Sequence, residues 1–104
     1  DKRRKENIVP TKWGVDDLMK VRVRDFDFKS TPEERRNRKT VGLIAQELEE
    51  IFPQAVSGDP HGNVDEDPMT VSLTEMVPLL IKSVQDQQKT IKELEDRIKK
   101  MEEK

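Results

Sequence analysis

The clearest pattern of apolar and polar positions fills the last third of the chain, from Leu73 to Lys104. Apolar residues recur there at spacings of four and three, and the register holds for about four heptads. Its a and d positions are Leu73, Val77, Leu80, Val84, Gln87, Ile91, Leu94, Ile98 and Met101. Only Gln87 is polar, and it either fixes the register of the helices or weakens their association. So narrow a stripe predicts a long helix that packs against partner helices, most simply identical copies in parallel.

The number of copies depends on the residues beside this stripe. β-branched residues at a with leucine at d favour dimers in the simplest parallel coiled coils. Met76 and Ile81, however, widen the apolar face at its start, which suits either a trimer or packing onto a globular body. Arg97 and Glu102 are spaced to pair between neighbouring parallel chains, an arrangement that resembles short trimeric coiled coils. We therefore expect a trimer, with a dimer or a solitary helix folded back on its own domain as the alternatives.

Before this helix, the chain alternates between short strand-like and helix-like stretches. Residues Glu6–Val9 form a candidate strand that a proline ends. After a turn, Val15–Val21 has the pattern of a short helix. The stretch 21–28 alternates, but its apolar positions change parity, which predicts a strand with a bulge near Arg24 and Asp25.

The middle of the chain combines an exposed stretch, a strand and a helix. Lys29–Lys39 is polar and charged, so we expect an exposed excursion between strands. The apolar run Val41–Ala45 predicts a buried strand, and Gln46–Phe52 continues as an amphipathic helix closed by a proline. Ala55–Val56 and Met69–Val71 are candidates for a further pair of strands on either side of a turn-rich stretch.

The start of the long helix carries its own signals. Ser72 and Glu75 have the spacing of a capping box, and Pro78 removes a backbone hydrogen bond and predicts a kink. We predict an α+β fold in two parts, a small mixed domain over residues 1–71 and a helix over residues 72–104 that forms a parallel trimeric coiled coil. The predicted trimer interface comprises Leu73, Val77, Leu80, Ile81, Val84, Gln87, Ile91, Leu94, Arg97, Ile98, Met101 and Glu102.

Composition excludes several classes of protein. Charged residues make up 40% of the 104 residues and aromatic residues 4%, with a mean hydropathy of -0.92. Scattered apolar residues at this composition would indicate disorder, but here they are patterned. The net charge of -2 mixes both signs, so neither a nucleic acid nor a membrane is indicated as a partner. The one basic cluster, Lys2–Lys5, is more typical of a solvated terminus than of a phosphate-binding arm.

Cysteine is absent, which excludes disulfide and thiolate chemistry. No apolar run reaches membrane-spanning length, and the start of the chain lacks the pattern of a signal peptide. The chain also begins without methionine, and we expect it to be a fragment or a processed product.

The most suggestive metal pattern is incomplete. Asp59, His61, Asn63 and Asp65 alternate as at the start of a calcium loop, but Thr70 stands where a bidentate carboxylate is required. A single histidine without cysteine disfavours a tetrahedral zinc site. The spacing also offers no glycine-rich phosphate loop and no catalytic triad. The residues alone therefore predict an oligomerising interaction module that uses no metal and no cofactor.

Three blocks in order add a resemblance. The first runs from Asp1 to Ile8, the second from Val41 to Leu48 with a following Phe-Pro pair, and the third from Leu73 to Leu80 into the coiled coil. Together they resemble the intramolecular chaperone of auto-processing domain. That domain closes many phage tail spikes, tail fibres and neck appendages, and it also occurs in membrane-bound transcription factors of the myelin regulatory factor type.

The resemblance implies a domain that trimerises, guides the folding of an upstream fibre in the same polypeptide, and then cuts itself off. In the family the cut follows a serine, and a lysine five residues after that serine is the general base. Lys5 occupies the lysine position, so the serine would immediately precede Asp1, the expected first residue of the cleaved product. Only a neutral lysine can activate a serine, so we expect burial or nearby positive charge to favour that form. Gly42 is a weaker candidate, as a backbone donor to the oxyanion, and a glycine there could equally permit close packing of strands.

Three other functions remain open. A non-cleaving trimerisation foot would share the coiled coil without the reaction. A distal receptor-binding tip would need an exposed aromatic or polar pocket, and we expect the three phenylalanines and the one tryptophan to lie in the core. A transcription factor would have a DNA-binding domain upstream and a membrane span downstream. If the leading hypothesis holds, we expect the protein to be located in the host cytoplasm during virion assembly, or in the virion tail if the domain is retained.

Overall fold

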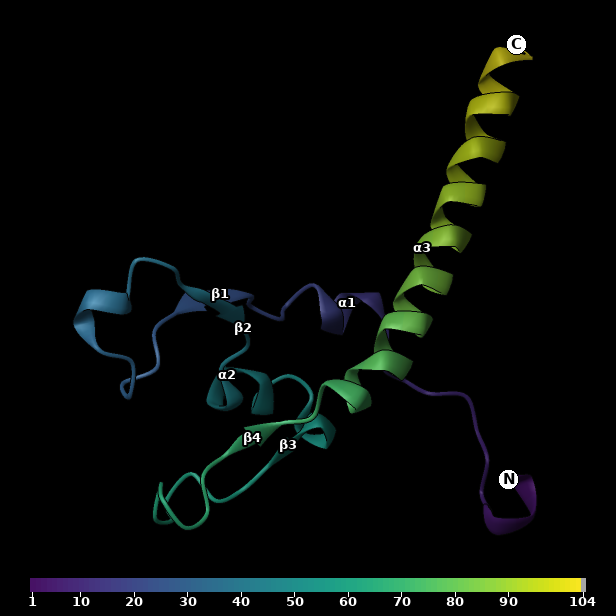
Figure 1. Ribbon diagram of the computed structural model, residues 1–104. Helices are drawn as coiled ribbons and strands as arrows, with labels where there is room; N and C mark the ends of the chain where they lie inside the picture. The colour runs from purple at the N-terminus through teal and green to yellow at the C-terminus, as the bar shows by residue number, and fades with distance from the viewer. Residues whose placement is uncertain (104) are drawn as a thin grey trace.

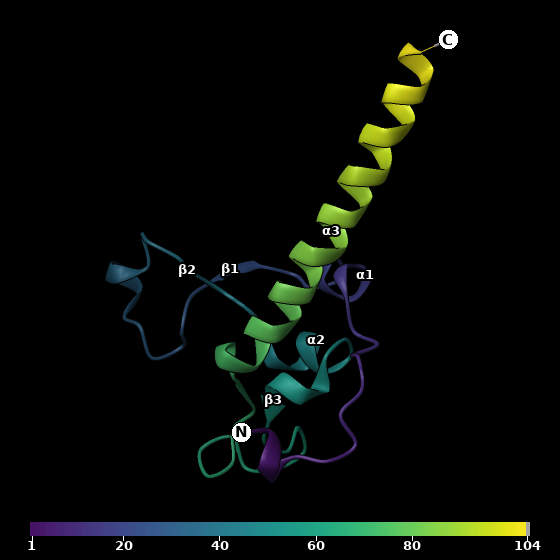
Figure 2. The same cartoon turned by 90° about the vertical axis from the view of Figure 1, so that its right-hand side faces the viewer.

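The computed structural model describes residues 1–103 as a small α+β body from which one long helix projects (Figures 1 and 2). The principal extents are 64 × 44 × 23 Å, and the radius of gyration is 19.7 Å. A compact chain of about 100 residues has a radius of gyration of about 13 Å. The radius of gyration is larger here because the end of the long helix projects from the body, and every residue from 87 to 103 is exposed.

The body is built from short elements. The helices are α1 (Val15–Leu18), α2 (Ala45–Glu49) and the long α3 (Leu73–Glu102), and the single 3₁₀ turns are η1 (Lys2–Arg4), η2 (Glu33–Arg35) and η3 (Pro53–Ala55). The strands are β1 (Arg24–Phe26), β2 (Thr40–Gly42), β3 (Val56–Ser57) and β4 (Thr70–Val71). This mixture of short antiparallel strands, short helices and one long C-terminal helix confirms the predicted fold class.

The strands form two separate antiparallel ribbons. Asp25 lies opposite Val41 in the β1–β2 ribbon, and Val56 lies opposite Val71 in the β3–β4 ribbon. The second pairing confirms the predicted partnership of residues 55–56 with residues 69–71. The connection between β1 and β2 is the expected charged excursion, which extends away from the body (Figure 1).

The hydrophobic core lies where α2, η3 and the first turns of α3 meet. Its buried members are Leu48, Phe52, Ala55, Met76 and Leu79. Trp13, which precedes α1, packs its ring edge-on against Phe52 with centroids 5.0 Å apart. The start of α3 is therefore part of the body's core, and only its later turns project.

The N-terminal strand prediction is wrong. Residues Glu6–Val9 form no strand, Asn7 takes the left-handed conformation with φ 54°, and Ile8 and Val9 are exposed. A strand requires backbone partners, and this segment runs apart from both ribbons (Figure 1).

The bulged strand is also wrong. Only Arg24–Phe26 of the stretch 21–28 is paired, in a regular register without a bulge. The parity change is absorbed because the strand ends at Phe26, which leaves Phe28 beside it, 57% exposed. The expectation that every aromatic side chain lies in the core therefore fails at Phe28.

The predicted buried strand Val41–Ala45 is wrong in length and in burial. β2 ends at Gly42, and Val41 is 67% exposed because a two-stranded ribbon turns one face to water. The helix that follows is confirmed but shorter than predicted, since α2 ends at Glu49. A further turn, in which the Phe52 N–H donates to the Leu48 carbonyl at 2.8 Å, carries Phe52 into the core.

The long helix begins where the heptads predict. Ser72 is its N-cap, but the predicted capping box is wrong because the Ser72 side chain makes no capping hydrogen bond. Its backbone N–H instead donates to the Ala55 carbonyl at 2.7 Å, which ties the helix to η3. Pro78 lies within a continuous helix whose first turn leans away from the axis of the later turns (Figure 1).

Candidate interface and processing segment

Helix α3 has two apolar faces with different environments. Met76, Leu79 and Ser83 form one face, and all three are buried against the body. The Ser83 hydroxyl donates to the Leu79 carbonyl at 2.7 Å, so this buried polar group is satisfied. This face lies about 100° around the helix from the heptad stripe. Met76, considered above as a flank of the stripe, thus belongs to the intramolecular core.

The heptad stripe itself remains uncovered. Its large apolar side chains are between 46% and 72% exposed, namely Leu73, Val77, Leu80, Ile81, Val84, Ile91, Leu94, Ile98 and Met101. Gln87, Arg97 and Glu102 are exposed as well. Monomeric soluble proteins rarely leave so continuous an apolar surface open to water. The alternative in which the helix folds its stripe back onto its own domain is therefore wrong.

Two shallow hollows interrupt the stripe. One, of about 430 Å³, is lined by Val77, Leu80, Ile81, Val84 and Gln85. It has the composition of a hole that receives a side chain from a facing helix. The second hollow, of about 480 Å³, is lined by Gln87, Thr90 and Ile91 of α3 together with Val15 of α1. At this level the body reaches the edge of the stripe.

The N-terminal segment carries the other candidate residues. Asp1 caps η1 by accepting a hydrogen bond from the Arg3 backbone N–H at 2.9 Å, and its carboxylate pairs with the Arg3 guanidinium at 2.6 Å. Lys5 follows the turn in an extended conformation and is exposed. The segment is thus ordered locally, and its basic side chains face solvent in the single protomer.

Gly42 lies elsewhere, on β2 opposite Arg24. A Cβ atom at Gly42 would lie 3.2 Å from Cε1 of Phe26, so the close approach of this ring gives the glycine a packing role. The N-terminal segment and the β1–β2 ribbon lie on opposite sides of the molecule (Figure 1). A single protomer therefore does not bring Lys5 and Gly42 together.

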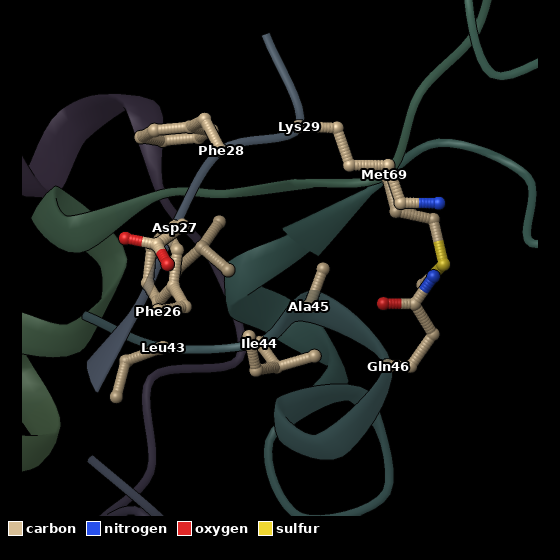
Figure 3. Close-up of a pocket in the computed structure, with 10 residues that line it drawn as sticks. Phe26, Asp27, Phe28, Lys29, Leu43, Ile44, Ala45, Gln46 and Met69 are labelled. Carbon is tan, nitrogen blue, oxygen red and sulfur yellow. The ribbon is translucent and has the colours of Figure 1, made fainter. Parts of the chain in front are cut away.

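An apolar hollow of about 390 Å³ lies between the β1–β2 ribbon, α2 and β4 (Figure 3). Phe26, Phe28 and Met69 contribute much of its lining. Its charged neighbours are not poised for chemistry, since Asp27 is paired with Lys39 at 2.5 Å. The hollow offers apolar surface without a converging set of reactive groups.

Sequence reasoning missed a charge cluster on the body. The Glu47 carboxylate accepts hydrogen bonds from Arg24 at 2.7 Å and from Arg22 at 3.4 Å. The hydrogen bond from Arg24 is the main reason that the pKa of Glu47 lies below its ordinary value, and Arg22 adds to it. The partners are more than twenty residues apart in sequence, so no local spacing could have indicated the pair.

The turn-rich loop between β3 and β4 satisfies its own polar groups. Asp59 accepts from the His61 backbone N–H at 2.9 Å, and Asn63 accepts from the Asp65 N–H at 2.8 Å. These are local Asx-type turns. Within residues 1–103, no three histidine, cysteine, aspartate or glutamate side chains gather as metal ligands would.

Comparison with known proteins extends these observations. Residues 1–57 match a family model described as chaperone of endosialidase. The long tail fiber proteins Gp37 of Enterobacteria phage M1 and Enterobacteria phage Ox2 are each 35% identical to this chain over 83 residues. The alignment covers 78% of this chain and 32% of each relative, so the chain spans about a third of their length. No solved structure matches. In the described part of the chain, no helix has the length and apolar character needed to cross a bilayer.

Proposed function

This chain belongs to the chaperone of endosialidase family, and from that premise we propose that it is the trimerising, self-releasing chaperone module of a phage tail fibre or spike protein. The two tail fiber relatives support a fibre as the parent polypeptide. The module would act during virion assembly in the host cytoplasm and would remain on the tail only if it stays bound after cleavage.

The observation that carries the proposal is the uncovered stripe of α3. The core of the body packs against a different face of the helix, so over residues 1–103 the apolar side chains of the stripe stay exposed, with Val15 reaching only its edge. Three parallel copies would bury it, with Ile81 widening the contact and Arg97 placed to reach Glu102 of the next chain. The upstream segments of the three polypeptides would then be held close together at the assembled body. This proximity lowers the entropic cost of forming an intertwined fibre fold.

Self-release would use a serine immediately before Asp1, with Lys5 as its general base. The base must be neutral to accept the hydroxyl proton. Lys5 is exposed in the protomer, so the burial that favours the neutral form has to come from neighbouring copies or from the upstream chain. In this mechanism cleavage follows assembly and therefore reports a completed fold.

The test uses the parent polypeptide with its upstream residues, followed by intact mass of every product. The unmodified protein is expected to yield a fragment that begins at Asp1, whereas Lys5→Ala stays whole. Lys2→Ala is the matched control, because it removes a neighbouring exposed positive charge and should cleave normally.

A non-cleaving trimerisation foot is the second candidate. The exposure of Lys5, and the separation of the N-terminal segment from the β1–β2 ribbon in one protomer (Figure 1), favour it. If the unmodified parent and Lys5→Ala both remain uncleaved in an assembled trimer, the protein is a non-cleaving trimerisation foot, and Lys5 does not act as a general base.

A further inference from the structure

One carboxylate joins the N-terminal part of the chain to the long helix. Oδ2 of Asp86 accepts a hydrogen bond from the backbone N–H of Val15 at 3.1 Å, across 71 positions of sequence. Its other oxygen, Oδ1, accepts from the Lys82 ammonium one turn earlier in α3. Asp86 is therefore held by its own helix while it holds the first residue of α1.

Gly14 fits this contact closely. Its φ of -167° is ordinary extended backbone that any residue adopts, so conformation alone does not require glycine. A Cβ atom here would lie 2.4 Å from Oδ2 of Asp86, which is far inside contact distance. The backbone N–H of Gly14 meanwhile donates to Asp17 at 3.1 Å. The glycine thus leaves the space that the carboxylate occupies.

The charge of Asp86 supports the same role. The hydrogen bond from Lys82, and after it the N–H of Val15, lowers the pKa of Asp86 below its ordinary value. The carboxylate therefore stays ionised as an acceptor through the physiological range. Charge-assisted hydrogen bonds of this kind are stronger than neutral ones.

The position along α3 gives the contact its significance. Asp86 directly precedes Gln87, the polar member of the heptad stripe, and Val15 lines the hollow that Gln87 and Ile91 share. The side chains of Lys82 and Asp86 can contact each other only when this turn of α3 is helical, because the two residues are one helical turn apart. The contact therefore links the chain that follows the N-terminal segment to the part of α3 where copies would meet.

We propose that Asp86 is a positioning residue that fixes the end of the N-terminal segment, at Gly14 and Val15, against α3 and so sets the point from which the segment after the cut extends. This role rests on the proposed self-cleaving function, but the placement itself is measurable without cleavage. Trp13 is the sole tryptophan of the chain and lies one residue before Gly14, so its emission reports the placement directly.

The first experiment uses this chain and three variants, Asp86→Ala, Gly14→Ala and the double variant. Alanine at 86 favours the helix more than aspartate does, so a loss in Asp86→Ala cannot be ascribed to weakened helix propensity. Each single variant is expected to speed hydrogen exchange of the Val15 amide at least tenfold and to shift Trp13 emission to longer wavelength. The double variant should be no worse than either single one, because both act on the same contact.

Asp96→Ala is the matched control, since Asp96 is an exposed aspartate of the same helix. Its Val15 exchange and Trp13 emission should equal those of the unmodified chain. Additive losses in the double variant, or an unchanged Val15 exchange rate in Asp86→Ala, would overturn the placement role.

The second experiment places Asp86→Ala and Asp96→Ala in the parent polypeptide with its upstream residues. Asp86→Ala is expected to slow release at least tenfold while the oligomer mass is unchanged, and Asp96→Ala should cleave at the original rate. Release at the original rate from Asp86→Ala contradicts a positioning role in cleavage. If the unmodified parent does not cleave, the self-cleavage proposal fails, and the exchange and emission data alone decide whether Asp86 places the segment.

Discussion

Two carboxylates at the edges of the small hydrophobic core accept several hydrogen bonds each. Glu47 of α2 receives Arg24 of β1, and Asp86 of α3 receives Lys82 and the N–H of Val15. Hydrogen bonds from these partners lower the pKa values of both carboxylates. The contacts of Glu47 with Arg24 and of Asp86 with Val15 join elements that are far apart in the sequence, whereas Lys82 and Asp86 lie one turn apart in the same helix.

Acid should weaken the body for this reason. A carboxylate whose pKa is lowered by folding contributes stability above its unfolded pKa, about 4, and loses it as the pH falls through its folded value. The urea midpoint is therefore expected to fall between about pH 5 and pH 3. Glu47→Gln should lower the midpoint at pH 7 and flatten this fall, whereas Glu49→Gln, at an exposed position of α2, should leave the profile unchanged. If the urea midpoint of Glu47→Gln depends on pH just as that of the unmodified chain does, the Arg24–Glu47 pair does not contribute to the acid sensitivity. The effect should be small, since exposed ion pairs contribute little.

The sequence indicated roles for several single residues, but it did not indicate which residues they contact. Lys5 and Asp1 were identified through a resemblance, and their catalytic role stays a prediction. Gly42 was noted both as an oxyanion donor and as a site of close packing, and the ring of Phe26 beside it supports packing. Gly14 and Asp86 were missed, because a contact across 71 positions leaves no periodic signal.

At the scale of elements, α3 divides its work between two faces. Leu79 is 2% exposed in the core, whereas its neighbour Leu80 is 46% exposed on the stripe. Adjacent leucines of one helix therefore lie in different environments, one in the core of the protomer and the other on the exposed stripe that we propose as the contact between copies.

This pair gives a matched test. Leu79→Ala should destabilise the protomer by about 2–5 kcal/mol, because it leaves a cavity in a packed core. Leu80→Ala should change the protomer little and instead weaken association. Thermal unfolding at two protein concentrations separates the effects: Leu79→Ala lowers the midpoint at both concentrations, and Leu80→Ala enlarges its dependence on concentration. Equal behaviour of the two variants would contradict a helix with two separate faces.

The heptads, the β3–β4 pair and the helix after β2 could be predicted because each has a local period or a turn signal. The strand predicted at Glu6–Val9 and the bulge predicted near Arg24 do not form, and the sequence could not show this because strand formation depends on which partner lies alongside. Val41 illustrates the limit further. Its apolar run indicated burial, but a two-stranded ribbon has only one covered face.

The whole molecule combines a small body with a long projecting helix. Its body has a small core, and its longest element extends an apolar stripe into solvent (Figures 1 and 2). The resemblance drawn from the three residue blocks is confirmed at the level of the family.

The most direct test of association through the stripe is the mass of the chain in solution, measured by sedimentation equilibrium for the unmodified chain and for Leu94→Asp. The chain is 12.1 kDa, and the account predicts a species of about three times that mass. A charge at Leu94, on the projecting part of the stripe, should give a folded monomer, while the Lys92→Asp variant, changed on the outward face, should stay trimeric. A monomeric unmodified chain at concentrations where the helix is folded would exclude association through the stripe, and a dimer would retain the interface but reject the trimer.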